Sequence, residues 1–101
     1  MISILKHLLM MKRIRIYVHG KVQGVFYRYN TKKIADSLNI NSLFFTQPFS
    51  SVEILAEGFD DNLKKFIEWC KVGPPMARVE RLDVIEEKNI TKKLSDFKII
   101  W

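Results

Sequence analysis

The sequence predicts one α+β domain, in which two helices pack on one face of a mixed, mainly antiparallel sheet. Its 101 residues, 48% of them hydrophobic, suffice for one core and not for two. Apolar residues alternate with polar ones in several short runs, which indicates strands, and recur at three- and four-residue spacing in two longer runs, which indicates helices. The first six of these runs follow the order βαββαβ, which is the ferredoxin-like or split-βαβ sandwich.

The first half of the chain supplies a strand, a glycine-bearing loop and a helix. Ile14, Ile16 and Val18 alternate with polar neighbours, as in a half-buried strand. After the loop, apolar residues recur at helical spacing up to Leu38. Asn39 suits the left-handed conformation that ends such a helix.

The second half supplies strands near 42–47 and 51–57, a second helix, and strands near 78–86 and 95–101. The second helix begins near Asp60 and is stopped by the run 73–75, Gly-Pro-Pro. Its apolar stripe includes the single cysteine, Cys70, which we expect to be a buried thiol. One cysteine excludes an intramolecular disulfide and suits a reducing compartment, so we expect a cytoplasmic protein.

Residues 1–11 form an N-terminal extension ahead of a domain that spans 12–101. The extension is apolar but too short to cross a membrane, and it lacks the features of a signal peptide. The net charge is +6, which suits anionic ligands. The basic residues are spread along the chain without an aromatic-basic motif, so a solvated surface is favoured over nucleic-acid binding.

The loop between the first strand and the first helix carries the strongest functional signal. Gly20 and Gly24 allow successive backbone N–H groups to point into one concavity that opens onto a helix N-terminus, which is a site for an oxyanion. Arg28 adds a planar cationic fork that can hold two oxygens of one phosphate. The loop therefore predicts a site for a small phosphoryl group.

The segment 18–28, VHGKVQGVFYR, resembles the acylphosphatase family, in which this stretch reads V-x-G-x-V-Q-G-V-x-F-R. Tyr27 in place of phenylalanine is the one departure. Further matches follow in order over the rest of the chain, so that the resemblance covers roughly residues 12–101: Ala35, Leu38, Ser51-Val52-Glu53-Ile54, Ala56-Glu57-Gly58, Gly73-Pro74, Ala77, Val79 and Phe97-Lys98-Ile99.

The resemblance implies the same fold and the hydrolysis of carboxyl-phosphate anhydrides without a metal or an organic cofactor. It also implies that Arg28 binds the phosphate. The remaining phosphate contacts would come from the loop, chiefly from its backbone N–H groups: Gly20, Lys21, Val22, Gln23, Gly24, Val25 and Phe26.

The family also places an asparagine at the end of the second strand, where it orients the attacking water within a pattern such as G-x-V-x-N-x-x-D-G-S-V-E. Counted back from Ser51 without a gap, that position is Thr46. A threonine hydroxyl is shorter than a carboxamide and makes fewer hydrogen bonds. A one-residue shift would present the amide of Gln47 instead, but it would turn every neighbouring side chain to the other face. Asn41 lies at the far end of the strand.

The same segment, 42–50, carries three phenylalanines where the family has small, polar or turn residues: Phe44, Phe45 and Phe49. Consecutive strand residues face opposite sides, so one of Phe44 and Phe45 enters the core and the other lies on the open face of the sheet. The replacements are either local repacking or a contact surface for a ligand, a partner or a second copy of this chain.

Two weaker candidates have simpler explanations. His7 and His19 lack further ligands at useful spacing, which favours surface histidines over a metal site or a proton shuttle. Glu57, Asp60 and Asp61 are interpreted as acidic residues at a helix start rather than as a carboxylate cluster.

Two functions therefore remain. The first is an acyl-phosphate hydrolase with weak or lost activity, because Thr46 replaces the asparagine. The second is a module that binds phosphate, sulfate or another anion without turnover and uses the hairpin 42–50 for self-association or another contact.

Overall fold

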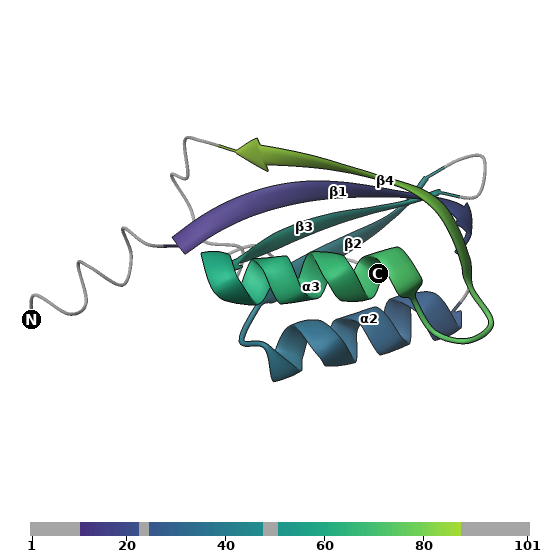
Figure 1. Cartoon of the computed structure of the whole chain (residues 1–101), viewed down its shortest axis with the longest axis horizontal. Helices are drawn as coiled ribbons and strands as arrows, with labels where there is room; N and C mark the ends of the chain where they lie inside the picture. Colours follow the sequence, from purple (N-terminus) through teal and green to yellow (C-terminus); the bar gives the residue numbers. More distant parts are fainter. Residues whose placement is uncertain (1–10, 23–24, 48–50, 88–101) are drawn as a thin grey trace, which may run out of the picture.

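In the part of the chain that the structure describes, four strands form one sheet, and two helices cover one of its faces (Figure 1). The computed structural model describes residues 11–22, 25–47 and 51–87, and for Val25, Thr46 and Gln47 it describes the backbone alone. The elements in chain order are β1 (Met11–Lys21), α2 (Val25–Ser37), β2 (Asn41–Gln47), β3 (Ser51–Phe59), α3 (Asp60–Val72) and β4 (Arg78–Glu87).

The spatial order of the strands is β2-β3-β1-β4, so that β1 lies inside the sheet between β3 and β4. All three pairings among the described strands are antiparallel. The α+β sandwich with two helices on a mainly antiparallel sheet is therefore confirmed. The expected last strand, 95–101, lies outside the described residues, as do residues 1–10 of the expected extension; β1 itself begins at Met11.

The core lies between the sheet and the two helices. Ile14, Ile16 and Val18 of β1 are at most 5% exposed, as their alternation predicts. They pair across the sheet with the apolar face of β3, which is equally buried. The helices contribute buried side chains at three- and four-residue spacing: Ala35 from α2, and Leu63, Phe66 and Cys70 from α3. Cys70 is thus the buried thiol that the sequence predicts.

Both helices end as the sequence predicts. After α2, Asn39 adopts φ of 56°, and the N–H of Ile40 donates to the carbonyl of Ala35 at 2.8 Å. At the end of α3, Gly73 adopts φ of 69°, and its N–H donates to the carbonyl of Trp69 at 2.8 Å. These left-handed positions turn the chain sharply back towards the sheet.

The face of the sheet away from the helices carries ion pairs. Arg13 is 8% exposed, and its guanidinium lies 3.0 Å from the carboxylate of Glu57, which is 1% exposed. The interpretation of Glu57 as a helix-start acid is therefore wrong, because Glu57 belongs to β3 and balances a buried arginine. Asp60 and Asp61 do stand in the first turn of α3, as expected.

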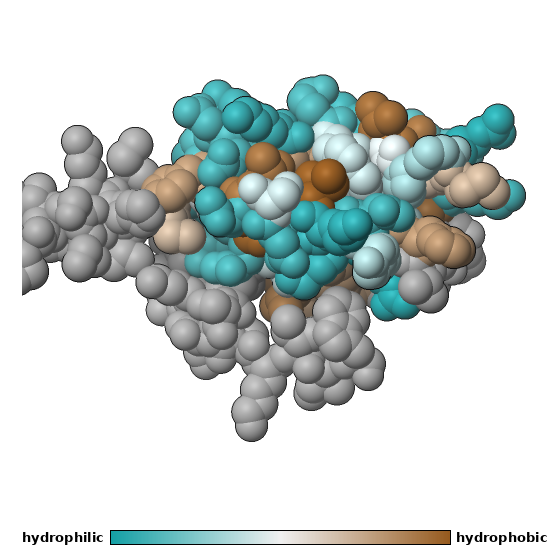
Figure 2. All heavy atoms as spheres, turned by 90° about the horizontal axis from the view of Figure 1, so that it is seen from below, coloured by the Kyte–Doolittle hydropathy of each residue, from teal (hydrophilic) through white to brown (hydrophobic). Residues whose placement is uncertain are grey.

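The outer faces of the helices are mainly polar. Seen from the helix side, hydrophilic side chains cover most of the described surface, and hydrophobic ones form separate patches among them (Figure 2). Among the described residues, neither helix has the length and apolar character needed to cross a membrane.

Candidate functional site

The glycine-bearing loop joins the end of β1 to the start of α2. β1 ends at Lys21 and α2 begins at Val25, so the connection is short. Arg28 consequently lies in the first turn of α2, at the helix N-terminus where the sequence predicts it. Gln23 and Gly24 of the expected phosphate site lie outside the described residues.

Gly20 lies at a close contact between the backbones of β1 and β4. Its φ is 134°, and a Cβ at this position would lie 2.1 Å from the carbonyl oxygen of Arg78. The β1–β4 register also shifts between His19 and Gly20, which marks a bulge. Backbone conformation and close contact together require glycine at the entry to the loop.

Side chains on both sides of the loop are anchored in the core. Val22 is 1% exposed and Tyr27 is 3% exposed. The hydroxyl of Tyr27 donates to the backbone carbonyl of Cys70 at 3.2 Å, and burial raises the pKa of the phenol. The side chain of Val22 therefore serves packing, so its expected contact with phosphate is limited to its backbone. Phe26, in contrast, projects into solvent and is 74% exposed.

The two cationic side chains of the expected site are available to a ligand. Arg28 is half-buried and Lys21 is exposed. Within the described part of the chain, neither side chain forms an ion pair or a hydrogen bond. An arginine on the first turn of a helix, with no carboxylate partner among the described residues, is suited to an anion that approaches the helix N-terminus.

The end of β2 lies at the same end of the sheet as the loop. Thr46 is opposite Val52 of β3, and Val52 is opposite Val18 of β1, two residues before Gly20. Neighbouring strands are about 4.8 Å apart, so the backbones of Thr46 and Val18 are separated by roughly 10 Å. Asn41 pairs with Glu57 at the other end of β2.

The two described phenylalanines of β2 face opposite sides, as predicted. Phe44 is 6% exposed and belongs to the core, whereas Phe45 is 43% exposed. Phe44 is therefore wrong as a residue of a contact surface, since its side chain packs under the helices. Phe49 lies outside the described residues.

His19 is a surface histidine, as expected. Its Nε2 lies 3.0 Å from a carboxylate oxygen of Asp83 and 3.3 Å from the guanidinium of Arg81. Among the described residues, no three His, Cys, Asp or Glu side chains are grouped to hold a metal ion. His7 lies outside the described residues.

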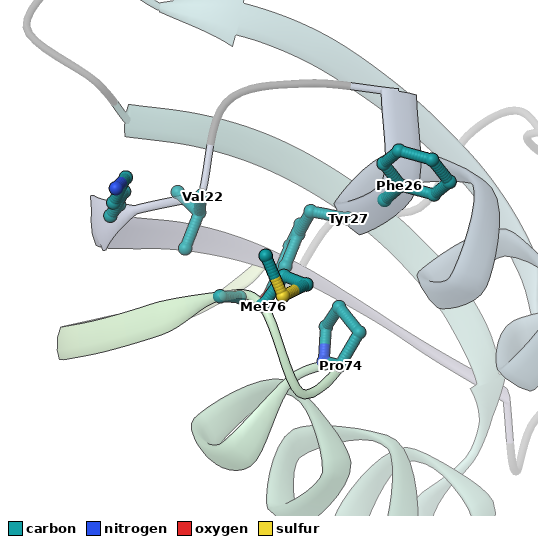
Figure 3. A pocket seen from close by; sticks show the side chains of 7 residues that line it. Val22, Phe26, Tyr27, Pro74 and Met76 are labelled. Atoms are coloured by element: carbon teal, nitrogen blue, oxygen red, sulfur yellow. The ribbon is translucent and has the colours of Figure 1, made fainter.

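A pocket of about 110 Å³ adjoins the loop; we call it the loop pocket. Residues on both sides of the loop form part of its wall, and the α3–β4 connection forms the rest (Figure 3). The lining residues are Lys21, Val22, Phe26, Tyr27, Pro74, Met76 and Ala77. Pro74, Met76 and Ala77 were not among the predicted site residues; an apolar methionine directly after the turn-forming prolines is the feature of the sequence that could have indicated them.

Comparison with known proteins identifies a family over most of the chain. The family model described as acylphosphatase matches residues 14–99. An acylphosphatase of Syntrophus aciditrophicus (strain SB) is 44% identical over 92 residues, which cover 91% of this chain and 95% of that protein.

Two solved structures are similar in fold and sequence. The crystal structure of acylphosphatase from Bacillus subtilis has a TM-score of 0.74 at 35% identity, covering 79% of this chain and 89% of that one. An acylphosphatase from Coxiella burnetii has a TM-score of 0.76 at 30% identity, covering 85% and 93%. The family match over nearly the whole chain, together with these relatives, shows that the chain belongs to the acylphosphatase family.

Proposed function

We propose that this chain hydrolyses acyl phosphates and holds the phosphoryl group with Arg28 and the backbone N–H groups of the loop 20–26. The observation that supports the proposal most strongly is the position of Arg28. It stands on the first turn of α2, directly after the loop, and no described residue neutralises it. The charge, the helix N-terminus and the loop amides are all suited to the same small dianion.

In the proposed reaction, a water attacks phosphorus from the side opposite the acyl oxygen. The new P–O bond forms as the bond between phosphorus and the acyl oxygen breaks. The carboxylate leaves with the electron pair of the broken bond, and the proton lost by the water passes to solvent or phosphate. Arg28 and the loop amides stabilise the charge on the phosphoryl oxygens while this exchange takes place.

We further propose that turnover is weak, because Thr46 occupies the position of the water-orienting asparagine. A water held out of line with the leaving oxygen reacts slowly, since catalysis here depends on positioning. Loss of one such positioning group commonly lowers the rate by a factor on the order of 10²–10³.

The test is hydrolysis of benzoyl phosphate by the purified protein and by Arg28→Ala. We expect slow turnover that Arg28→Ala abolishes. Lys33→Ala is the matched control, because it removes one positive charge from the exposed side of the same helix, and it should retain full activity. Turnover that is absent, or that survives in Arg28→Ala, would contradict the proposal.

The contribution of Thr46 is tested by Thr46→Asn, with Thr46→Val as the control. If the asparagine is the missing element, Thr46→Asn should raise kcat by a factor on the order of 10². Thr46→Val should stay at or below the starting rate. An unchanged rate in Thr46→Asn would show that this position does not orient the water.

A second candidate, an anion-binding module that self-associates through β2, is favoured by the exposure of Phe45. This large apolar side chain is 43% exposed on the face of the sheet away from the helices. Under this alternative, phosphate binds without turnover, and Phe45→Lys weakens a concentration-dependent assembly measured by sedimentation. Ile85→Lys, at a 52% exposed position of β4, serves as the control. A monomer at all concentrations would eliminate the assembly.

A further inference from the structure

The walls of the loop pocket come from three parts of the chain, and two of these parts, the end of β1 with Val22 and the first turn of α2, belong to or adjoin the loop 20–26 to which we assign the phosphoryl group. Val22 stands on one side, and Phe26 and Tyr27 of α2 stand on the other (Figure 3). Met76 and Pro74 approach from the connection between α3 and β4. A molecule whose phosphate lies in the loop would therefore have this pocket as its immediate neighbour.

Tyr27 and the turn from Pro74 to Ala77, which form part of the wall, are held by contacts that exist without a ligand. The ring of Tyr27 is fixed by its hydrogen bond to Cys70 and lies against Gly73, where a Cβ would come within 3.0 Å of the ring. The N–H of Ala77 donates to the carbonyl of Pro74 at 3.0 Å, which closes the turn that presents Met76. This part of the wall is thus in place before a ligand binds, so little conformational entropy is lost in ordering it.

The chemistry of the lining indicates an anion with an apolar body. Apart from Lys21, the lining side chains are apolar or, for Tyr27, present a ring whose hydroxyl is already bonded. Lys21 provides positive charge without a partner among the described residues. Apolar cavities of about 150 Å³ bind benzene, so the volume of about 110 Å³, partly open to solvent, suits a phenyl ring or a short branched chain.

We propose that the loop pocket receives the acyl group of the substrate and that it selects compact apolar acyl groups, aromatic or branched, over acetyl. This inference rests on the proposed function, because it assumes that the phosphoryl group lies in the adjoining loop. The preference for larger acyl groups follows from the apolar surface area that each acyl group buries in the pocket. The methyl of an acetyl group leaves most of the pocket to water, whereas a ring displaces that water and contacts Val22, Tyr27 and Ala77.

The test uses acyl phosphonates, which resemble acyl phosphates but are not hydrolysed, so binding is measured independently of turnover. Benzoylphosphonate, acetylphosphonate and inorganic phosphate are titrated calorimetrically. We expect benzoylphosphonate to bind about tenfold more tightly than acetylphosphonate, the effect of five additional carbons at the lower end of observed ligand efficiencies.

Two variants locate the preference in the pocket. Ala77→Val adds bulk to the wall, and Met76→Ala removes one wall at a position 85% exposed, where truncation leaves the core intact. Each should reduce the preference for benzoylphosphonate while the affinity for inorganic phosphate stays the same. Val72→Ala is the matched control, because Val72 is also an exposed apolar residue, 73% exposed, but does not line the pocket.

The outcomes separate this inference from the proposed function. Equal binding of the two phosphonates, or a preference that neither Ala77→Val nor Met76→Ala reduces, overturns the assignment of the pocket. Failure of all three anions to bind, or binding that Arg28→Ala leaves unchanged, overturns the proposed function and the inference with it.

Discussion

The hydroxyl of Tyr27 donates a hydrogen bond of 3.2 Å to the backbone carbonyl of Cys70. This contact joins the first turn of α2, which carries Arg28, to the last turns of α3. Both residues are buried, since Tyr27 is 3% exposed and Cys70 is fully buried. The start of α2, which directly follows the proposed phosphate-binding loop 20–26, is therefore held to α3 by a buried contact.

Removal of this hydrogen bond should lower stability. We expect Tyr27→Phe to reduce the free energy of unfolding by about 1 kcal/mol, since the carbonyl of Cys70 loses a buried donor. Urea denaturation measures the change. Tyr29→Phe, at a 59% exposed position on the same helix, is the control and should change stability little. Equal effects of the two substitutions would contradict a role for this contact.

Alkaline pH should destabilise the fold through the thiol of Cys70. Burial raises its pKa to about 12 from the ordinary value of 9.0. Between these values the unfolded chain loses the proton and the folded chain retains it, so stability is unaffected below about pH 9 and falls as pH rises. The slope approaches about 1.4 kcal/mol per pH unit for one group.

This prediction is checked by urea denaturation of the wild type and Cys70→Ala between pH 8 and pH 11. The alanine variant is less stable from the start because it leaves a cavity. Its free energy of unfolding should nevertheless fall less steeply with pH than that of the wild type. The difference between the two slopes is the contribution of the thiol. The remaining slope includes Tyr27, whose pKa burial raises in the same direction. Parallel profiles would show that the thiol does not contribute.

Replacement of Gly20 by alanine should destabilise the fold severely. In Gly20→Ala, the new Cβ would lie 2.1 Å from the carbonyl oxygen of Arg78 in a backbone conformation that alanine avoids. We expect the free energy of unfolding to fall by at least about 3 kcal/mol, or the variant not to fold.

Gly58→Ala is the control for this prediction. Its Cβ would lie 3.1 Å from a carbon of the Ile40 side chain, and this side chain can adjust. A loss of about 1 kcal/mol is expected there. Similar losses in both variants would contradict the argument.

Removal of one partner of the pair Arg13–Glu57 should destabilise the fold strongly, whereas replacement of both partners by apolar residues should have a small effect. Glu57→Leu removes the carboxylate 3.0 Å from a buried guanidinium, and we expect it to cost about 3–5 kcal/mol. Glu57→Leu combined with Arg13→Met should recover most of this loss, because both charges of this pair are then removed together. Additive losses in the double variant would show that the pair does not act as a unit. Asp36→Asn, in an exposed pair with Lys32, should cost only a few tenths of a kcal/mol.

The order of the described elements, the helix ends at Asn39 and Gly73 and the core positions Ile14, Ile16 and Val18 could be predicted from the sequence. These features follow from short-range rules: side-chain periodicity, and the few residues that tolerate a left-handed backbone. The position of Arg28 at a helix N-terminus was predictable for the same reason.

The contacts between segments far apart in the sequence could not be predicted and are known from the assembled fold. The pairing of Arg13 with Glu57, the wall that Met76 and Ala77 add to the loop pocket, and the choice of Phe44 rather than Phe45 for the core depend on strand register and on the α3–β4 turn. A periodic pattern indicates which residues lie on the same face of a strand or helix. It does not indicate which face another segment covers, or which segment does so. Those choices are settled by the packing of segments far apart in the chain, because burial and close contact are properties of the assembled layers.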